Sequence, residues 1–400
     1  MVKPGYKETE AGVIPKDWEA KPIQSFARIA MCKRIFAEQT SEMGEIPFYK
    51  IGTFGKEADA YIPRKLYLEY REKFSFPQKG DILISAAGTL GRTVKFDGKD
   101  SYFQDSNIVW LDIDKEQLCN EYLYQYYRVI KWASSEGSTI SRLYNGIIYS
   151  TYVTLPPLQE QKKIAKALSD MDELIASLEK LIAKKKAVKQ GAMQELLTGK
   201  KRLPGFDGEW KSIYLLSICQ LFNGLTYTPN DISDIGTLVL RSSNIKNSEL
   251  VFDDNVFVTC PIDSPKYIKK DDIVICVRNG SATLIGKCAK AAQDYNITFG
   301  AFMAVLRGEH NNFVFQILQE GRIQQNILKN SGATINQITN GDFRKIKIKM
   351  PPTLEEQQAI ASILSDMDAE IKALEQKLAK CRQTKRGMMQ QLLTGKIRLV

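Results

Sequence analysis

The sequence predicts an α+β protein with two α+β domains in tandem repeat, separated by two long helices that form an antiparallel intramolecular coiled coil. Residues 158–203 return without a gap as residues 354–399, an offset of 196 in a chain of 400 residues. Both copies carry apolar residues at heptad spacing, which is the pattern of paired helices. The stretches before them alternate short β-branched and aromatic runs with Gly, Asn, Asp and Pro, which is typical of strands and turns. The chain is therefore built from two related halves.

The repeated segment has the features of one long helix in each half. Each copy follows a proline pair and ends in Leu-Leu-Thr-Gly-Lys, where Gly199 and Gly395 are typical helix stops. About 40 residues in each copy would give a helix of roughly 60 Å. The predicted seam consists of Ile164, Leu168, Met171, Ile175, Leu178 and Ile182 in the first copy and of Ile360, Leu364, Met367, Ile371, Leu374 and Leu378 in the second.

The seam needs a partner, and the sequence allows two. Each helix could pack only on its own globular domain. Two matching seams in one chain, a whole domain apart, favour pairing between the two helices instead. If a pseudo-twofold axis relates the halves, the paired helices must run antiparallel.

The domain bounds follow from the helical segments. We predict a first domain at 1–155, a first long helix at 156–200, a second domain at 201–350 and a second long helix at 351–400. The two domains share faint anchors, among them Trp18 and Trp210. Inside the domains, apolar periodicity indicates shorter helices at 121–132 and 313–329.

The composition excludes several classes of protein. No apolar run approaches the roughly 18 residues of a membrane span, and the polar start does not resemble a signal peptide, so we expect a cytoplasmic protein without membrane contact. Seven cysteines without a CxxC pair predict reduced core thiols, with no disulfide framework and no metal site. The single histidine, His310, leaves no material for a His-based triad, and we expect it at the surface.

The net charge of +10, with a pI near 9.0, permits nucleic-acid binding without requiring it. Much of the excess lies in the first repeat, around Lys184, Lys185, Lys186 and Lys189. These lysines could follow a DNA backbone. Lysine near the C-terminal end of a helix is also favoured by the helix dipole and by solvation, so the charge leaves both interpretations open.

The repeated motif resembles a known family. Two α+β domains, each followed by a long helix that contains Leu-Ser-Asp-Met-Asp and ends in Leu-Leu-Thr-Gly-Lys-x-Arg-Leu, are similar to the specificity subunit of type I restriction-modification enzymes. The resemblance covers essentially the whole chain. It implies that each domain is a target-recognition domain that reads one half of an asymmetric, bipartite site in double-stranded DNA.

The resemblance also implies partners. The paired helices would set the unread spacer and dock two copies of a methyltransferase subunit, and two restriction subunits could join the complex. S-adenosylmethionine would then enter with the methyltransferase and ATP with Mg²⁺ with the restriction subunit, and this chain would bind no cofactor itself. Repeated residues on the helices favour two equal docking surfaces: Glu160 with Glu356, Gln161 with Gln357, Lys184 with Lys380, and Gln194 with Gln390. The same residues could equally be the solvated flanks of a coiled coil.

Base reading requires polar and cationic side chains on loops that reach the grooves. Glycine-bearing loops after strand-like runs supply such residues in both domains, although these glycines could serve only to form turns. The candidate DNA-contacting residues are Lys33, Arg34, Lys50, Thr53, Lys56, Thr89 and Arg92 in the first domain, and Arg241, Ser243, Asn244, Lys246, Arg278, Asn279, Ser281 and Lys287 in the second. Tyr227 and Asn223 are weaker candidates.

Catalytic readings find little support, so we predict no catalytic residue. The Pro-Pro pairs lack the Asn or Asp of an adenine methylase motif, and Gly280 to Cys288 is one residue too long for a phosphate loop. A nuclease that uses Asp81 and Lys99 ranks last, because Asp97-Gly98 reads better as a hairpin turn. The main alternative is a coiled-coil scaffold that joins two protein-binding modules.

Overall fold

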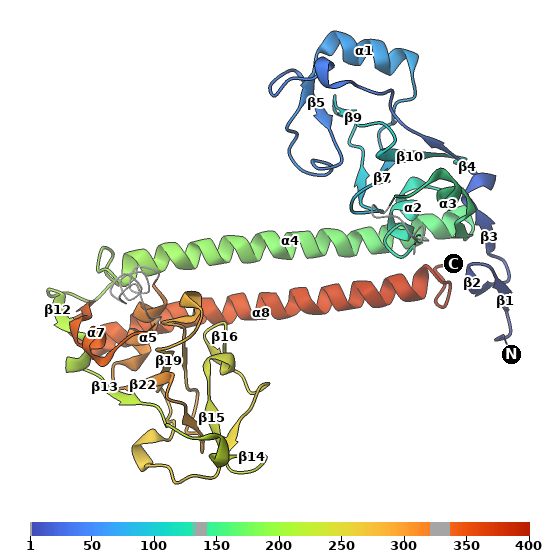
Figure 1. Ribbon diagram of the computed structural model, residues 1–400. Helices are drawn as coiled ribbons and strands as arrows, with labels where there is room; N and C mark the ends of the chain where they lie inside the picture. Colours follow the sequence, from blue (N-terminus) through green and yellow to red (C-terminus); the bar gives the residue numbers. More distant parts are fainter. Residues whose placement is uncertain (1, 131, 133–141, 321–336) are drawn as a thin grey trace. The chain divides into compact units, whose positions relative to one another are not determined.

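The computed structural model describes residues 2–130, 132, 142–320 and 337–400 (Figure 1). The chain divides into two compact units, one formed by Met1–Glu179 with Gln376–Val400 and the other by Lys180–Glu375. Each unit thus holds one α+β domain, the beginning of one long helix and the end of the other. We describe each unit by itself.

A four-stranded antiparallel sheet forms the centre of the first unit. Its strands, from edge to edge, are β4 (Ala27–Ala30), β10 (Ile108–Ile113), β7 (Ile82–Ser85) and β8 (Thr93–Lys95). Side chains of β10 alternate between two cores, with Val109 and Leu111 on one face and Ile108 and Trp110 on the other. Burial of both faces explains why β7 and β10 are apolar runs rather than alternating ones.

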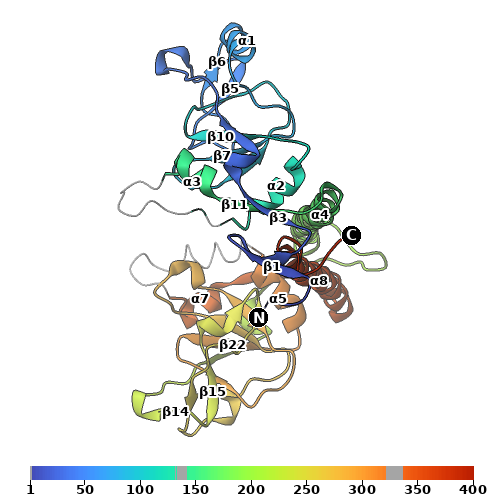
Figure 2. The same cartoon turned by 90° about the vertical axis from the view of Figure 1, so that its right-hand side faces the viewer.

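Each face of this sheet meets a different group of elements. The core on the face of Ile108 and Trp110 includes a three-stranded sheet in which β5 and β9 pair in parallel. The core on the face of Val109 and Leu111 includes residues of the long helices. Helix α1 lies at the end with β5 and β6, and α2 and α3 lie at the end with β3 and β11 (Figure 2). The bounds are β1 (Tyr6–Thr9), β2 (Gly12–Pro15), β3 (Glu19–Pro22), β5 (Ile46–Tyr49), β6 (Tyr61–Ile62), α1 (Arg64–Lys73), β9 (Tyr102–Phe103), α2 (Asn120–Tyr126), α3 (Asn145–Ser150) and β11 (Tyr152–Leu155).

The second unit repeats this plan. Its central sheet has the same strand order, β13 (Gln220–Asn223), β22 (Met303–Arg307), β19 (Ile273–Cys276) and β20 (Cys288–Lys290). A second sheet again contains one parallel pair, β15 with β21. The remaining elements are β12 (Lys211–Tyr214), β14 (Ile232–Ser233), β15 (Thr237–Leu240), β16 (Ile245–Lys246), β17 (Glu249–Leu250), β18 (Phe257–Val258), β21 (Thr298–Phe299), α5 (Asn311–Gln319), α7 (Asn340–Lys345) and β23 (Lys347–Met350).

Single turns of 3₁₀ helix connect many of these elements. They are η1 (Ile23–Ser25), η2 (Ala37–Gln39), η3 (Leu215–Ser217), η4 (Pro229–Asp231), η5 (Ser242–Asn244), η6 (Ser264–Lys266) and η7 (Ala282–Leu284). The helix predicted at 121–132 is shorter than expected, because α2 ends at Tyr126 and tight turns follow it. The helix predicted at 313–329 corresponds to α5, and residues 321–329 lie outside the described part of the chain.

The two long helices are α4 (Leu158–Leu196) and α8 (Leu354–Leu392), each of 39 residues. Their first turns complete the core of the domain that precedes them: Ile164 and Leu168 pack in the first unit, and Ile360 and Leu364 in the second. Of the twelve predicted seam residues, seven are buried and five are half-buried. The seam therefore serves both predicted purposes, packing on the domain and pairing with the other helix.

Ion pairs show that the helices run antiparallel within each unit. In the first unit, Glu179 of α4 pairs with Arg382 of α8 at 2.6 Å, and Asp172 pairs with Lys385. In the second unit, Lys186 pairs with Glu375 at 2.6 Å and Lys189 with Asp368 at 2.6 Å. In both units the residue number rises along α4 as it falls along α8.

An arginine clasp fastens the end of one helix to the beginning of the other in each unit. Arg398 donates two hydrogen bonds of 2.8 Å to Glu160 and two more, of 2.7 and 2.8 Å, to Asp17, and it lies over the ring of Trp18. Burial alone would raise the pKa of the Glu160 carboxyl, but hydrogen bonds from Arg398 and Trp18 outweigh it and hold the pKa below its ordinary value.

The second unit has a corresponding clasp, in which Arg202 bonds the carbonyls of Asp207 and Gly208 in place of an aspartate side chain. Arg202 donates hydrogen bonds of 2.6 and 2.8 Å to Glu356 and lies over the ring of Trp210. Gly199 and Gly395 precede the two clasp arginines with φ near +70°. A Cβ atom at Gly395 would lie 2.4 Å from Cδ of Pro15, and one at Gly199 would lie 3.0 Å from the Trp210 ring. The repeated glycine is thus required both as a helix stop and as a close contact.

Candidate nucleic-acid interface

Three loops of the first unit meet at one edge of its small sheet. Because β5 and β9 run parallel, the loops that follow them, residues 50–56 and 104–107, leave the same edge. The backbone N–H of Ile51 donates to Oε1 of Gln104 at 2.9 Å, which ties these two loops together. Arg92, in the turn after β7, donates to the carbonyl of Phe54 at 3.1 Å. The structure therefore brings the predicted residues of loop 50–56 and of the turn at 86–92 into one cluster.

Within this cluster the predicted residues play different parts. Lys50 pairs with Asp59 at 2.8 Å, and Thr53 closes the turn by hydrogen bonds to the backbone of Lys50. Lys56 and Thr89 have exposed side chains. They are the predicted residues of this cluster most open to a ligand.

The predicted neighbours Lys33 and Arg34 diverge. The Nε atom of Arg34 donates to Asp105 at 2.9 Å, which joins Arg34 to loop 104–107. The ammonium group of Lys33 instead lies 5.1 Å from the ring centroid of Phe74, which follows α1. Only Arg34 of this pair belongs to the loop cluster.

The second unit has a pocket of about 720 Å³ beside some of its predicted residues. Arg241 and Ser243 line it, as do residues that follow β13 and β21. Asn279 donates to the hydroxyl of Ser242 at 2.9 Å, so the turn after β19 is joined to the loop after β15. The guanidinium carbon of Arg278 lies 5.3 Å from the ring centroid of Phe302.

Several predicted residues of the second unit lie outside this pocket. Ser281 has an exposed side chain and shares a 2.8 Å hydrogen bond with Thr283. Lys287 is half-buried, and Lys246 is exposed and pairs with Asp253 at 2.8 Å. None of these three residues lines the pocket.

The prediction for Asn244 is wrong as a base contact. This side chain is fully buried, and its amide donates to the carbonyls of Val251 and Asp254 at 3.0 and 3.1 Å. Its carbonyl also accepts from the N–H of Arg241. Asn244 therefore shapes the loop and presents no free group to a ligand.

The two loop clusters share a backbone framework. In the first unit the N–H of Ala86 donates to the carbonyl of Asn107 at 2.7 Å, and in the second the N–H of Val277 donates to the carbonyl of Phe302 at 2.9 Å. Isolated bridges repeat as well, Ala87 with Arg142 and Arg278 with Gln337. Equivalent positions thus carry different side chains, Asn107 against Phe302 and Ala87 against Arg278.

Sequence reasoning missed the loops at 104–107 and 300–302. Both follow a short strand that ends in phenylalanine, Phe103 or Phe299, and both lead into an apolar strand. That shared pattern is the signal that could have found them. The structure adds Gln104, Asn107 and Phe302 to the candidate residues, and the weaker candidate Tyr227 lines the pocket of the second unit.

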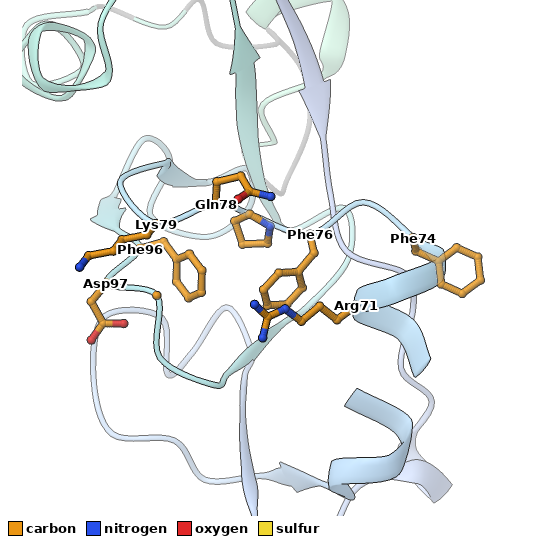
Figure 3. A pocket seen from close by; sticks show the side chains of 9 residues that line it. Arg71, Phe74, Phe76, Gln78, Lys79, Phe96 and Asp97 are labelled. Atoms are coloured by element: carbon orange, nitrogen blue, oxygen red, sulfur yellow. The ribbon is translucent and has the colours of Figure 1, made fainter. Parts of the chain in front are cut away.

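The first unit has a pocket of about 530 Å³ (Figure 3). Its lining includes Gln78 and Lys79 before β7 and Phe96 and Asp97 after β8. These segments are at the opposite end of the β7–β8 hairpin from the turn at 86–92. The pocket is therefore no part of the candidate interface.

The residues suggested for a nuclease have structural partners. Asp81 accepts hydrogen bonds from the N–H of Gln78 at 2.7 Å and from Asn120 at 3.0 Å, so it closes a turn and holds α2. Lys99 is exposed and pairs with Asp97. The prediction of a hairpin turn at Asp97-Gly98 is wrong, because this segment links β8 to β9, which belong to different sheets. The nuclease reading therefore loses its support.

The other reactive groups are also accounted for. The near-miss phosphate loop ends with Cys288 in strand β20, so no helix follows it. The seven cysteines are unpaired, and burial raises the pKa of the Cys219 and Cys288 thiols to about 12. Across the described residues, no group of three His, Cys, Asp or Glu side chains has the spacing of a metal site. His310 is not free at the surface as expected, since its Nδ1 lies 2.7 Å from Oε1 of Gln357 and the ring is half-buried.

Half of the helix residues predicted to face a partner are buried instead. Glu160 and Glu356 belong to the arginine clasps. The side-chain amide of Gln161 donates to the carbonyl of Gln117, and that of Gln357 donates to the carbonyl of Pro351. The outward pairs that remain exposed are Lys184 with Lys380 and Gln194 with Gln390.

Two domains of one fold, with different side chains on the same loop framework and with paired long helices, define a duplicated recognition protein. A family model described as "Type I restriction modification DNA specificity domain" matches residues 15–189 and again residues 207–381. The chain belongs to this family.

Individual relatives agree with this assignment. A protein of Haemophilus influenzae is 55% identical over 150 residues, a match that spans only 38% of this chain and 39% of that protein. The type I restriction enzyme MjaVIII specificity subunit of Methanocaldococcus jannaschii is 24% identical over 98% of this chain and 96% of its own. The solved S subunit of a type I restriction-modification system from M. genitalium has a TM-score of 0.64 over 98% of both chains at 16% identity, which is a likeness of fold.

No helix in the described ranges is long and apolar enough to cross a membrane.

Proposed function

We propose that this chain is the DNA specificity subunit of a type I restriction-modification complex, in which each domain reads one half of a bipartite, asymmetric site. The observation that carries the proposal is the shared loop framework with different side chains. The backbone bonds at Asn107 and Phe302 match, whereas the exposed groups differ. Such an arrangement suits two readers that dock on double-stranded DNA in the same way and recognise different bases.

The paired helices would set the spacer between the half-sites and dock two methyltransferase subunits. Support comes from the pseudo-symmetry of the helices, because the same exposed residues occur on both, such as Gln194 and Gln390. Two equal surfaces suit two copies of one partner. Two restriction subunits would join through this complex.

The chain itself would be non-catalytic. The residues with catalytic resemblance, Asp81 and Cys288, are committed to a turn and to a buried strand. S-adenosylmethionine would then be bound by the methyltransferase subunit, and ATP with Mg²⁺ by the restriction subunit. The complex would act on chromosomal DNA in the cytoplasm.

Selection from a randomised DNA library tests this proposal. The chain is purified with its methyltransferase subunits, and bound duplexes are sequenced after washes at 50 mM and 200 mM salt. The expected result is a motif of two short blocks with a fixed gap, bound more weakly at the higher salt because phosphate contacts release counterions. An assembled complex that enriches no motif would contradict the proposal and favour the protein-interaction scaffold.

A further inference from the structure

Phe302 is a large exposed apolar side chain that lines the pocket of the second reader. It lies in the short loop between β21 and β22, and 57% of its surface is exposed. Contiguous exposed apolar surface that is rimmed by polar residues is typical of interaction sites. None of the packing described above accounts for this exposure.

The loop that carries Phe302 is held rigidly. The carbonyl of Phe302 accepts from the N–H groups of Val277 and Arg278 at 2.9 and 3.2 Å, and Gly300 donates to Leu240 at 2.9 Å. The Arg278 guanidinium lies over the ring at 5.3 Å from its centroid. The ring is therefore presented outward on fixed backbone, with a cation beside it.

The surroundings of Phe302 combine apolar and polar groups. It lines the pocket of about 720 Å³ together with the aromatic Tyr227, the apolar Ile232 and the polar Arg241 and Ser243. Half of the Ile232 surface is also exposed, at 51%. The Nε atom of Arg241 is buried without a hydrogen-bond partner in the described chain. The lining also includes Asp254, whose carboxylate pairs with Arg241 at 2.8 Å. Apolar surface that is rimmed by hydroxyl, guanidinium and carboxylate groups suits a DNA base, which offers a methyl group or a ring face beside hydrogen-bonding edges.

We infer that Phe302 is a specificity-determining residue of the second reader, which makes an apolar contact with a DNA base while Arg278 holds its ring. This inference rests on the proposed function and deepens it. The contact surface on the base is either the C5 methyl group of thymine or the face of an unstacked base.

The first reader lacks this device. Its equivalent of Phe302 is Asn107, and its equivalent of Arg278 is Ala87. An amide at this position would favour hydrogen bonds to a base edge over an apolar contact. Substitution of Phe302 should therefore change the recognition of one half-site only.

The test uses the chain in complex with its methyltransferase subunits. Binding is measured for Phe302→Ala, for Phe302→Asn, which introduces the residue of the first reader, and for the control Ile235→Ala. Ile235 is 76% exposed in the same unit and does not line the pocket. Each thymine of the selected second half-site is replaced by uracil, which removes the methyl group. In a parallel series each adenine is replaced by 2-aminopurine, which still pairs with thymine and whose fluorescence rises on unstacking.

The wild-type complex should lose about tenfold in affinity on one thymine-to-uracil change, or show one 2-aminopurine signal, in the second half-site. Phe302→Ala should lose that response and relax the motif at that base, with the first half-site unchanged, whereas Ile235→Ala should behave as the wild type. Unchanged selectivity in Phe302→Ala, or an equal effect of Ile235→Ala, would overturn the inference. Failure of the proposed function looks different, since the wild-type complex would then select no bipartite motif at all.

Discussion

Lys189 donates hydrogen bonds of 2.6 and 2.7 Å to the two carboxylate oxygens of Asp368 on the opposite helix. Lys385 makes the matching contact with Asp172, and each residue lies 196 positions from its counterpart. Both lysines are nearly buried, with 11% and 10% of their side chains exposed. Such pairs are weak sources of stability but strong determinants of register, because a slip would leave a buried ammonium group unpaired.

We expect Asp172→Asn to destabilise the first unit by about 2 kcal/mol, because it leaves Lys385 buried without its counter-ion. Asp172 also accepts from Arg128 and Gln125 of the reading domain, so the loss reaches beyond the helix pair. Asp170→Asn is the control. Asp170 is exposed and, among the described residues, pairs only with Lys166 on the same helix, so its loss should cost at most about 0.5 kcal/mol. Urea unfolding of both variants checks this, and equal costs would contradict it.

The arginine clasp predicts a large effect at Arg398. The Glu160 side chain is only 3% exposed. Arg398→Ala would leave this buried carboxylate without its cation, and we expect a cost of about 3 kcal/mol in the free energy of unfolding. Arg398→Lys should recover little, because lysine lacks the fork that bonds Glu160 and Asp17 together. The exposed Lys396 offers a control, since Lys396→Ala should leave the melting temperature within a degree or two.

The same clasp predicts a dependence on pH. The pKa of Glu160 is held below its ordinary value, so its carboxylate stabilises the fold fully above about pH 4.5, and this contribution is lost as the pH falls through the lowered pKa. Glu160→Gln should therefore be much less stable than the wild type at pH 7 and closer to it at pH 3.5. Unfolding free energies at the two pH values measure the difference. If the unfolding free energies of the wild type and Glu160→Gln differed by the same amount at both pH values, the charge of Glu160 would not contribute to stability.

In each unit, substitution of the glycine at the helix stop and of the glycine inside the helix should have opposite effects on stability. Gly395→Ala should cost at least about 1 kcal/mol, because φ is +69° and the new Cβ atom would meet Pro15. Gly387→Ala should instead stabilise α8 by about 0.5 to 1 kcal/mol, since the site is helical and open. Gly199 and Gly191 form the same pair in the second unit. Thermal unfolding of the four variants distinguishes the stops from the interior glycines, and similar shifts at both kinds of site would contradict the account.

The long helices and the duplication were predictable because their signals are local. The heptad spacing lies within the 39 residues of each helix, and the proline pair and the glycine stop lie within three residues of its ends. The burial of Glu160 was not predictable, because its partner Arg398 is 238 residues away. A glutamate in the first helical turn is favoured by the helix dipole in any case. The sequence therefore cannot distinguish such a glutamate from one that also pairs with a distant arginine.

The loop clusters were only partly predictable for a similar reason. Residues 50–56 and 86–92 carry glycine signals, but loop 104–107 is brought to them by the parallel pairing of β5 with the two-residue strand β9. A strand of two residues has no measurable periodicity. Phe302 was missed because an exposed aromatic residue in a turn cannot be told from a core residue without the surrounding loops.

The central claim, that the two domains are independent readers, is tested most directly by domain replacement. Residues 205–349 are exchanged for the second domain of another family member, and methylated sites are mapped in DNA from cells that express each chain with the methyltransferase. We predict a bipartite motif in which only one half changes after the exchange. A motif that stays the same in both halves, or that changes in both, would contradict the account.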